Sequence, residues 1–155
     1  MKIYDLWGVC CFTTKGSCEK MWDEYADNHQ GVVIEYDNSH DSSIGTAGMV
    51  KYTDTKLSVN ILKINEEIIY KIFTTKENKW SYESEYRMVI RLPQPKCGIN
   101  MLFKDIIVRS VTIGKNTKND FKKRIENVCK SKGIQTFDLT SQGNEPEQHT
   151  RLGDL

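Results

Sequence analysis

The sequence predicts an α+β fold, as a single domain with a mixed, mostly antiparallel sheet flanked by about three helices. Two observations lead to this prediction. Short segments rich in β-branched and aromatic residues, which are typical of strands, are separated by segments whose apolar residues recur at helical spacing. These segments interleave without the regular rhythm of a parallel strand–helix–strand fold.

The N-terminal part of the chain is predicted to form a strand, a helix and a second strand. Residues 7–14 are β-branched and aromatic, which favours a buried strand. Ser17 is expected to cap a helix that Gly31 ends, and residues 31–36 are expected to form the next strand. The apolar stripe of this helix consists of Cys18, Met21, Trp22, Tyr25 and Ala26, with His29 as its extension.

The middle of the chain is predicted to contain a long helix followed by a long strand. Residues 49–52 are expected to form a short strand, and the helix runs from Lys56 to about Thr75. Its apolar face consists of Leu57, Ile61, Ile64, Ile68 and Ile72. Residues 80–92 alternate with period two, which predicts a strand that Pro93 ends.

The C-terminal part is predicted to form strand, helix and strand. Residues 103–113 favour strand structure, with a break at positions 109 and 110. A helix is predicted over about residues 118–131, and residues 134–139 are expected to form the last strand. The side chains that this helix is expected to turn inward are Phe121, Ile125 and Val128.

Length and composition favour one soluble domain. The domain of this 155-residue chain is expected to cover residues 1–139, with a polar, flexible tail over residues 140–155. Twenty-two basic and 21 acidic residues give a net charge of +1, so no global field attracts nucleic acid or anionic lipid. No apolar run reaches the roughly 20 residues of a membrane span, and the N-terminus lacks the features of a secretory signal. Five cysteines without a regular framework favour a reducing cytoplasm.

The most informative charged residues are Glu83, Glu85 and Arg87. On one strand they project from the same face, with successive Cα atoms about 6.5 Å apart. Two carboxylates at this spacing repel, which raises the pKa of one of them, while Arg87 holds its neighbour ionised. Such a pair can bind a sugar hydroxyl and stabilise positive charge as a glycosidic bond breaks. From spacing alone, a solvated strand face with an ion pair is the favoured interpretation.

A second group of candidate residues comprises Thr13, Thr14, Trp22, Tyr25 and His29. The two hydroxyls can hydrogen-bond a ribose or the main chain, the two large rings can stack on a planar ring, and His29 can donate to a phosphate. Trp22 and Tyr25 lie on the apolar stripe of their helix, which favours a core position for both. For His29, near the end of the helix, a core or capping role is favoured over a catalytic one.

Two further signals are weaker. The adjacent residues Cys10 and Cys11 point to opposite faces of a strand and have no paired partners, so we expect no metal site. Residues 115–132 carry a net charge of +5, which nucleic acid or an acidic partner can use. Because no aromatic residues interleave with these cations, solvation is favoured and nucleic acid is not the expected partner.

Together these segments resemble the bacterial domain of unknown function family 2971. The resemblance spans about residues 8–138. Members usually begin with a longer segment that contains an aromatic-His-aromatic-Thr string and carry a later Asn-Asp-Pro, so the resemblance implies a relative shortened at its N-terminus. The matching strings are Cys11-Phe12-Thr13-Thr14, Met21-Trp22-x-x-Tyr25-Ala26-x-x-His29-x-Gly31-Val-Val-Ile-Glu-Tyr36, Lys79-Trp80-x-Tyr82-Glu83-x-Glu85-x-Arg87 and Val111-Thr-Ile113-Gly114.

The same residues are more distantly similar to ADP-ribosyltransferases, which place an aromatic-Ser/Thr strand before a helix and a Glu-x-Glu on a later strand. The similarity implies that Glu85 holds the nicotinamide ribose of NAD and supports an oxocarbenium-like transition state. It also implies that Glu83 orients the acceptor and that Thr13 braces the strand. The strand that supplies a His or Arg to grip the dinucleotide in those enzymes has no counterpart in this sequence.

Two functions are therefore expected. The first is an ADP-ribosyltransferase-like domain that handles NAD or a related nucleotide as substrate, as a transferase or an NAD glycohydrolase, without a tightly bound cofactor. The alternative is a non-catalytic domain that binds a protein partner, as an inhibitor or immunity factor in conflicts between bacteria, phages and toxins. A third, weaker hypothesis is a domain that associates with RNA or DNA through residues 115–132.

Overall fold

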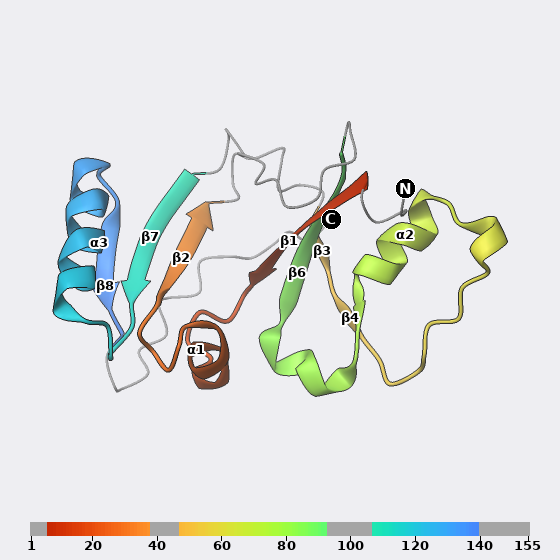
Figure 1. Cartoon of the computed structure of the whole chain (residues 1–155), viewed down its shortest axis with the longest axis horizontal. Coiled ribbons are helices and arrows are strands. Elements are labelled where there is room, and N and C mark those ends of the chain that lie inside the picture. The colour runs from red at the N-terminus through yellow and green to blue at the C-terminus, as the bar shows by residue number, and fades with distance from the viewer. Residues whose placement is uncertain (1–5, 38–46, 93–106, 140–155) are drawn as a thin grey trace, which may run out of the picture. The chain divides into compact units, whose positions relative to one another are not determined.

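The computed structural model describes residues 6–37, 47–92 and 107–139 (Figure 1). Helices and strands are mixed, which confirms the α+β prediction. The chain separates into two compact units, residues 1–16 with 36–107 and residues 17–35 with 108–155, and each is described by itself. The single domain over residues 1–139 stays a prediction. The tail expected over residues 140–155 lies outside the described residues.

The main sheet of the first unit has β6 (Glu85–Arg91) at its centre, between β1 (Trp7–Thr13) and β3 (Gly48–Met49) (Figure 1). Both neighbours run antiparallel to β6. The register of β1 and β6 pairs Trp7 with Arg91 and Thr13 with Glu85. The prediction of a strand over residues 7–14 is confirmed, and its last residues lie beside the first residue of β6.

The chain leaves this sheet at Val50 and enters a second, two-stranded sheet. There β4 (Lys51–Tyr52) pairs in parallel with β5 (Thr75–Lys76). The buried Val50 donates its N–H to the carbonyl of Glu85 at 2.9 Å, whereas the next N–H, of Lys51, donates to Thr74 at 2.8 Å. The strand predicted over residues 49–52 is therefore two short strands in different sheets. Because β3 pairs with β6 and β4 pairs with β5, the chain around Val50 joins the two sheets.

The long helix predicted from Lys56 to Thr75 is wrong in its first half. The structure has a short 3-10 helix, η3 (Ile61–Lys63), and then α2 (Glu66–Phe73). Asn65 caps α2, because its side chain accepts the N–H of Ile68 at 2.9 Å. Asn60 caps η3 in the same way. A short side chain that bonds the backbone at these positions favours a helix start over a continuing helix.

The strand predicted over residues 80–92 begins later than expected. Residues Asn78–Glu83 form a 3-10 helix, η4, and β6 starts at Glu85. Between them Ser84 has a left-handed backbone with φ of 43°. Glu83 therefore does not share a strand face with Glu85 and Arg87, which corrects the prediction. A single left-handed residue is enough to end the helix and redirect the chain.

The second unit has a three-stranded sheet in the order β2 (Val32–Asp37), β7 (Ile107–Ile113) and β8 (Gln135–Asp138). Its strand β7 pairs in parallel with β8, while the arrows of β2 and β7 point in opposite directions in Figure 1. The described strands thus form three sheets in all. Strand β7 continues through positions 109 and 110, so the predicted break is absent, and residues 103–106 lie outside the described residues.

The first helix, α1 (Glu19–Tyr25), is shorter than predicted. Cys18 occupies its N-cap, so Ser17 is not the cap. After the helix, Asp27, Asn28 and His29 all have positive φ, at 48°, 53° and 64°. The helix thus ends before Gly31, because three consecutive left-handed residues cannot continue it.

Helix α3 (Asn119–Ser131) confirms the helix predicted over residues 118–131, but not its orientation. Phe121 and Val128, expected inward, are 44% and 55% exposed. Cys129 is the buried residue of this helix, and Lys122 bonds Asp138 of β8 at 2.6 Å. The inward row therefore passes through Lys122 and Cys129, which places Phe121 and Val128 at the edge of the inward face instead of at its centre.

Candidate functional site

The candidate site begins with two side chains on the same face of β6. Glu85 and Arg87 are two residues apart on a strand, so their side chains project together. The guanidinium grips the carboxylate with two bonds, from Nε to Oε1 at 2.8 Å and from Nη2 to Oε2 at 2.9 Å. Its third nitrogen, Nη1, donates to the carbonyl of Phe73 at 2.6 Å. The predicted pairing of Glu85 with Arg87 on one strand face is confirmed, and Arg87 also connects β6 to the end of α2.

A lysine that the sequence analysis did not select completes the cluster. Lys76, at the end of β5, donates to Oε2 of Glu85 at 3.2 Å and to Oε2 of Glu83. Its ammonium group also lies 5.1 Å from the centre of the Trp80 ring. The carboxylates of Glu83 and Glu85 thus converge on one cation, although the two residues do not share a strand face. We call Lys76, Glu83, Glu85 and Arg87 the charge cluster.

The charge cluster is largely shielded from water. Glu83 and Glu85 are 3% and 5% exposed. Burial by itself raises the pKa of the Glu85 carboxyl, but hydrogen bonds from Arg87, Cys11 and Lys76 outweigh it and lower this pKa to about 2. Burial by itself lowers the pKa of Lys76, but the hydrogen bonds with Glu83 and Glu85 outweigh it and raise this pKa. Glu85 and Lys76 are therefore both charged at neutral pH, and the expectation that Arg87 holds its neighbour Glu85 ionised is confirmed.

Most of the acceptor capacity of Glu85 is used inside the chain. A carboxylate offers about four lone-pair positions. Arg87 occupies two of them and Lys76 a third. The peptide N–H of Glu85 is also engaged, because it donates to the hydroxyl of Tyr52 at 2.9 Å. A substrate hydroxyl at Glu85 therefore competes with three charge-assisted hydrogen bonds for this carboxylate.

The neighbouring thiols are poorly suited to act as nucleophiles. Burial, as the largest cause, and the neighbouring anionic Glu85 together raise the pKa of the Cys11 thiol to about 11. Burial also raises the pKa of Cys10. Since the thiolate is the reactive form, both groups are predominantly protonated at neutral pH. The described residues contain no group of His, Cys, Asp or Glu side chains suited to hold a metal ion.

Thr13 and Thr14 lie beside the charge cluster, at the end of β1. The hydroxyl of Thr13 donates to the carbonyl of Glu83 at 2.6 Å and accepts the N–H of Lys15 at 3.0 Å. The N–H of Thr14 donates to the carbonyl of Ser84 at 3.4 Å. Thr13 therefore fixes the left-handed turn that precedes β6, which is the bracing position that the resemblance to transferases implies for it.

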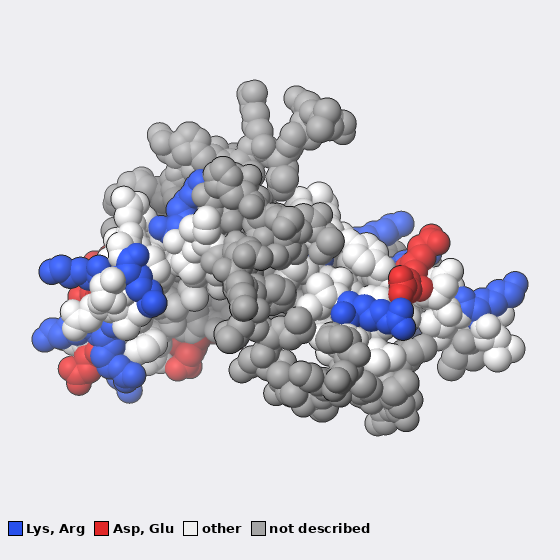
Figure 2. Space-filling view, turned by 90° about the horizontal axis from the view of Figure 1, so that it is seen from above, with Lys and Arg blue, Asp and Glu red and all other residues white. Residues whose placement is uncertain are grey.

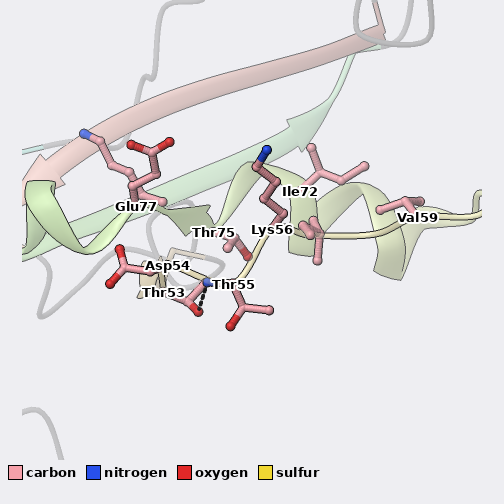
Figure 3. Close-up of a pocket in the computed structure, with 10 residues that line it drawn as sticks. Thr53, Asp54, Thr55, Lys56, Val59, Ile72, Thr75 and Glu77 are labelled. Carbon is pink, nitrogen blue, oxygen red and sulfur yellow. Dashed lines mark hydrogen bonds between the residues drawn. The ribbon is translucent and has the colours of Figure 1, made fainter.

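An open groove of about 780 Å³ adjoins the charge cluster, and Lys76 lines both. Figure 3 shows Val59 and Ile72 at one end of the groove, and Asp54 and Glu77 at the other. The remaining lining residues are Thr53, Thr55, Lys56, Leu57 and Thr75. Sequence analysis missed this groove, because residues 56–60 were assigned to a helix whereas they run outside any helix in the structure.

The candidate residues Tyr25 and His29 belong to the second unit. Tyr25 is largely exposed, which corrects its expected core position, whereas Trp22 is buried as expected. His29 is buried and stacks on Trp22, with the rings parallel and their centres 5.7 Å apart. Its Nε2 lies 2.9 Å from a carboxylate oxygen of Glu19 and 3.1 Å from one of Asp23. A phosphate at this nitrogen has to displace two carboxylates, so the geometry favours the core role.

The position of His29 also explains a glycine. A Cβ on Gly114 lies 2.1 Å from the carbonyl oxygen of His29, closer than any side chain tolerates. The same carbonyl accepts the N–H of Asn116 at 3.0 Å. The left-handed turn at His29 therefore packs directly on the backbone that follows β7, and only glycine fits at position 114.

We expect the contribution of Glu85 to stability to depend on pH. Its folded-state pKa of about 2 lies below the ordinary value of 4.5, so its stabilising effect is fully present above pH 4.5 and is lost as the pH falls towards 2. Glu85→Gln should therefore lower the unfolding midpoint at pH 7, and its difference from wild type should shrink between about pH 5 and pH 2.

The measurement is urea unfolding followed by circular dichroism at several pH values. Glu66→Gln serves as the matched control, since Glu66 forms an exposed ion pair with Arg91 at 2.8 Å. Exposed pairs contribute about 0–1 kcal/mol, so this control should differ little from wild type at any pH. A Glu85→Gln difference that is the same at pH 7 and pH 2.5 would contradict the ionised, paired state of Glu85.

Comparison with known proteins gives one match. A family described as "Protein of unknown function (DUF2971)" matches residues 21–88, from within α1 to within β6. This segment contains both the Trp-x-x-Tyr-Ala-x-x-His-x-Gly and the Trp-x-Tyr-Glu-x-Glu-x-Arg strings. No curated protein and no solved structure matches the chain, and the similarity to ADP-ribosyltransferases receives no support. The helices of the described segments are too short or too polar to span a bilayer. Residues 21–88 are thus similar to a family whose activity is not known.

Proposed function

We propose that the chain is a non-catalytic domain that binds a protein partner, of the inhibitor or immunity-factor class. One observation carries the proposal: the carboxylate of Glu85 already accepts three hydrogen bonds from two cations, Arg87 and Lys76. A catalytic carboxylate has to accept a hydrogen bond from substrate or face a developing positive charge. In the charge cluster, two cations already face the two carboxylates, so little unbalanced negative charge is left to stabilise a transition state.

Substrate binding at Glu85 also carries an energetic cost. A ribose hydroxyl that takes the place of Lys76 or Arg87 on this carboxylate breaks a charge-assisted hydrogen bond. The cation that is released then lies partly buried without its counter-charge, which is unfavourable. The charge cluster is consequently better suited to hold the fold than to exchange partners during a reaction.

The groove next to the charge cluster supplies a surface for a protein partner. The apolar residues that line it are Leu57, Val59 and Ile72. The side chain of Ile72, on α2, is 41% exposed. Leu62, in the preceding η3 helix, is 91% exposed. Apolar side chains that gather on an open surface beside polar ones are typical of sites where proteins meet.

The partner experiment is a pull-down that compares the proteins retained by wild type with those retained by two variants. Ile72→Lys places a charge in the groove, whereas Val9→Lys makes the same change on β1 at a residue of similar exposure, 39%. We expect a protein that wild type and Val9→Lys retain and that Ile72→Lys loses, because a lysine cannot be desolvated there without a partner. Equal capture by both variants would exclude the groove as the binding surface.

An NAD-handling domain, acting as an ADP-ribosyltransferase or NAD glycohydrolase, is the second candidate. It is favoured by the ionised state of Glu85, whose pKa of about 2 supplies the negative charge that an oxocarbenium-like transition state requires. In this proposal Lys76 moves away from Glu85 when the ribose binds, Glu83 orients the acceptor, and Arg87 and Thr13 keep Glu85 in place.

Isothermal titration calorimetry with NAD separates the two candidates. The protein-binding proposal predicts no heat of binding up to millimolar NAD for wild type, Glu85→Gln or the control Glu66→Gln. Binding by wild type and by Glu66→Gln that Glu85→Gln weakens would contradict it and support the NAD-handling domain. Circular dichroism at the titration temperature confirms that each variant is folded.

A further inference from the structure

Several cations on the exposed surface of α3 and at its two ends have no ion-pair partner among the described residues. Two cations in this region are paired: Lys115 with Glu19 at 3.4 Å, and Lys122 with Asp138 at 2.6 Å. For the others no ion pair is found within the parts of the chain that the structure describes. These are Lys118, Lys123, Arg124, Lys130 and Lys132. Figure 2 shows basic side chains gathered at the left of the view, where α3 lies in Figure 1, with few acidic ones among them.

An aromatic ring, Phe121, lies on the same side of the helix as Lys118, Arg124 and Lys132, contrary to the sequence-based expectation. Phe121 was assigned to the core, but the inward row of α3 runs through Lys122 and Cys129, and Phe121 is 44% exposed. Arg124, three residues further on, is its neighbour on the helix surface, and Val128 lies one helical repeat away. The surface therefore combines cations with an accessible ring.

We propose that this surface of α3 binds single-stranded nucleic acid, with the cations on the phosphates and Phe121 stacked on a base. Single-strand binding without sequence preference requires these two components, a cationic track and an aromatic platform. From Lys118 to Lys132 the helix extends about 21 Å, at 1.5 Å per residue. That length accommodates several consecutive phosphates of one strand.

The ring distinguishes a single strand from other anionic partners. In a duplex the bases are stacked on one another, so an exposed phenyl ring on a convex helix has no free base face to contact. An acidic protein segment matches the cations equally well but has no requirement for an aromatic ring beside Arg124. The proposal concerns the second unit only, and it is independent of the groove and of the charge cluster.

The probe is a fluorescently labelled 15-nucleotide oligo-dT, titrated with the full chain and followed by anisotropy. Binding should weaken steeply with salt, with a slope of log K against log [salt] of about −2 to −3 for three or four phosphate contacts. Phe121→Ala should weaken binding about tenfold, because stacking of one base is lost. The double reversal Arg124→Glu with Lys132→Glu should abolish binding at 50–100 mM salt, which is roughly the range in which phosphate contacts dominate.

Controls separate this site from general charge effects. Lys63→Glu with Lys71→Glu makes the same change of net charge on exposed residues of the first unit and should leave most of the affinity intact. Absence of oligo-dT binding at low salt, or equal losses in the two double variants, would overturn the proposal. So would a polyglutamate peptide that binds as tightly as oligo-dT, with neither ligand affected by Phe121→Ala, because the surface would then be specific for acidic polypeptides.

Discussion

The first unit depends on the charge cluster, in which Glu85 pairs with Arg87 and Lys76. Through it, one carboxylate at the start of β6 is bonded to the end of β5, and Arg87 is bonded to the last turn of α2. The backbone of Glu85 adds contacts with the hydroxyl of Tyr52 and the N–H of Val50. Segments 33 residues apart, at Tyr52 and Glu85, therefore meet at a single residue of β6. Because each charge in the cluster has its partner, the chain can bury them at this junction.

The same interaction determines which functions the first unit can support. A carboxylate that is ionised, buried and bonded to two cations is well suited to hold the fold. It is poorly suited to catalysis unless one of these donors moves away. The groove that shares Lys76 with the cluster is open and partly apolar, which suits a partner that binds without chemistry. In the second unit, His29 is likewise engaged with Trp22 and two carboxylates, which suits packing better than phosphate recognition.

Sequence reasoning succeeded where periodicity or local spacing carries the information. The strand over residues 7–14 follows from β-branched and aromatic residues, the pairing of Glu85 with Arg87 follows from period two, and both are confirmed. Lys76 was missed, because no local pattern reveals a contact between β5 and β6. The helix expected from Lys56 failed at Asn60 and Asn65, whose capping side chains were a readable signal. Phe121 was misplaced because the apolar stripe of α3 also includes Cys129, and only packing decides which edge of a stripe is buried.

A double-mutant cycle between Glu85 and Arg87 tests the central claim most directly. The free energy of unfolding is measured for wild type, Glu85→Gln, Arg87→Gln and the double variant at pH 7. If the carboxylate is anchored by Arg87, each single change is strongly destabilising, and the coupling energy is about 1–3 kcal/mol, since the second change removes no further pairing between them. A coupling near zero, with Glu85→Gln as stable as wild type, would contradict the structural role of Glu85 and return this residue to the candidates for catalysis.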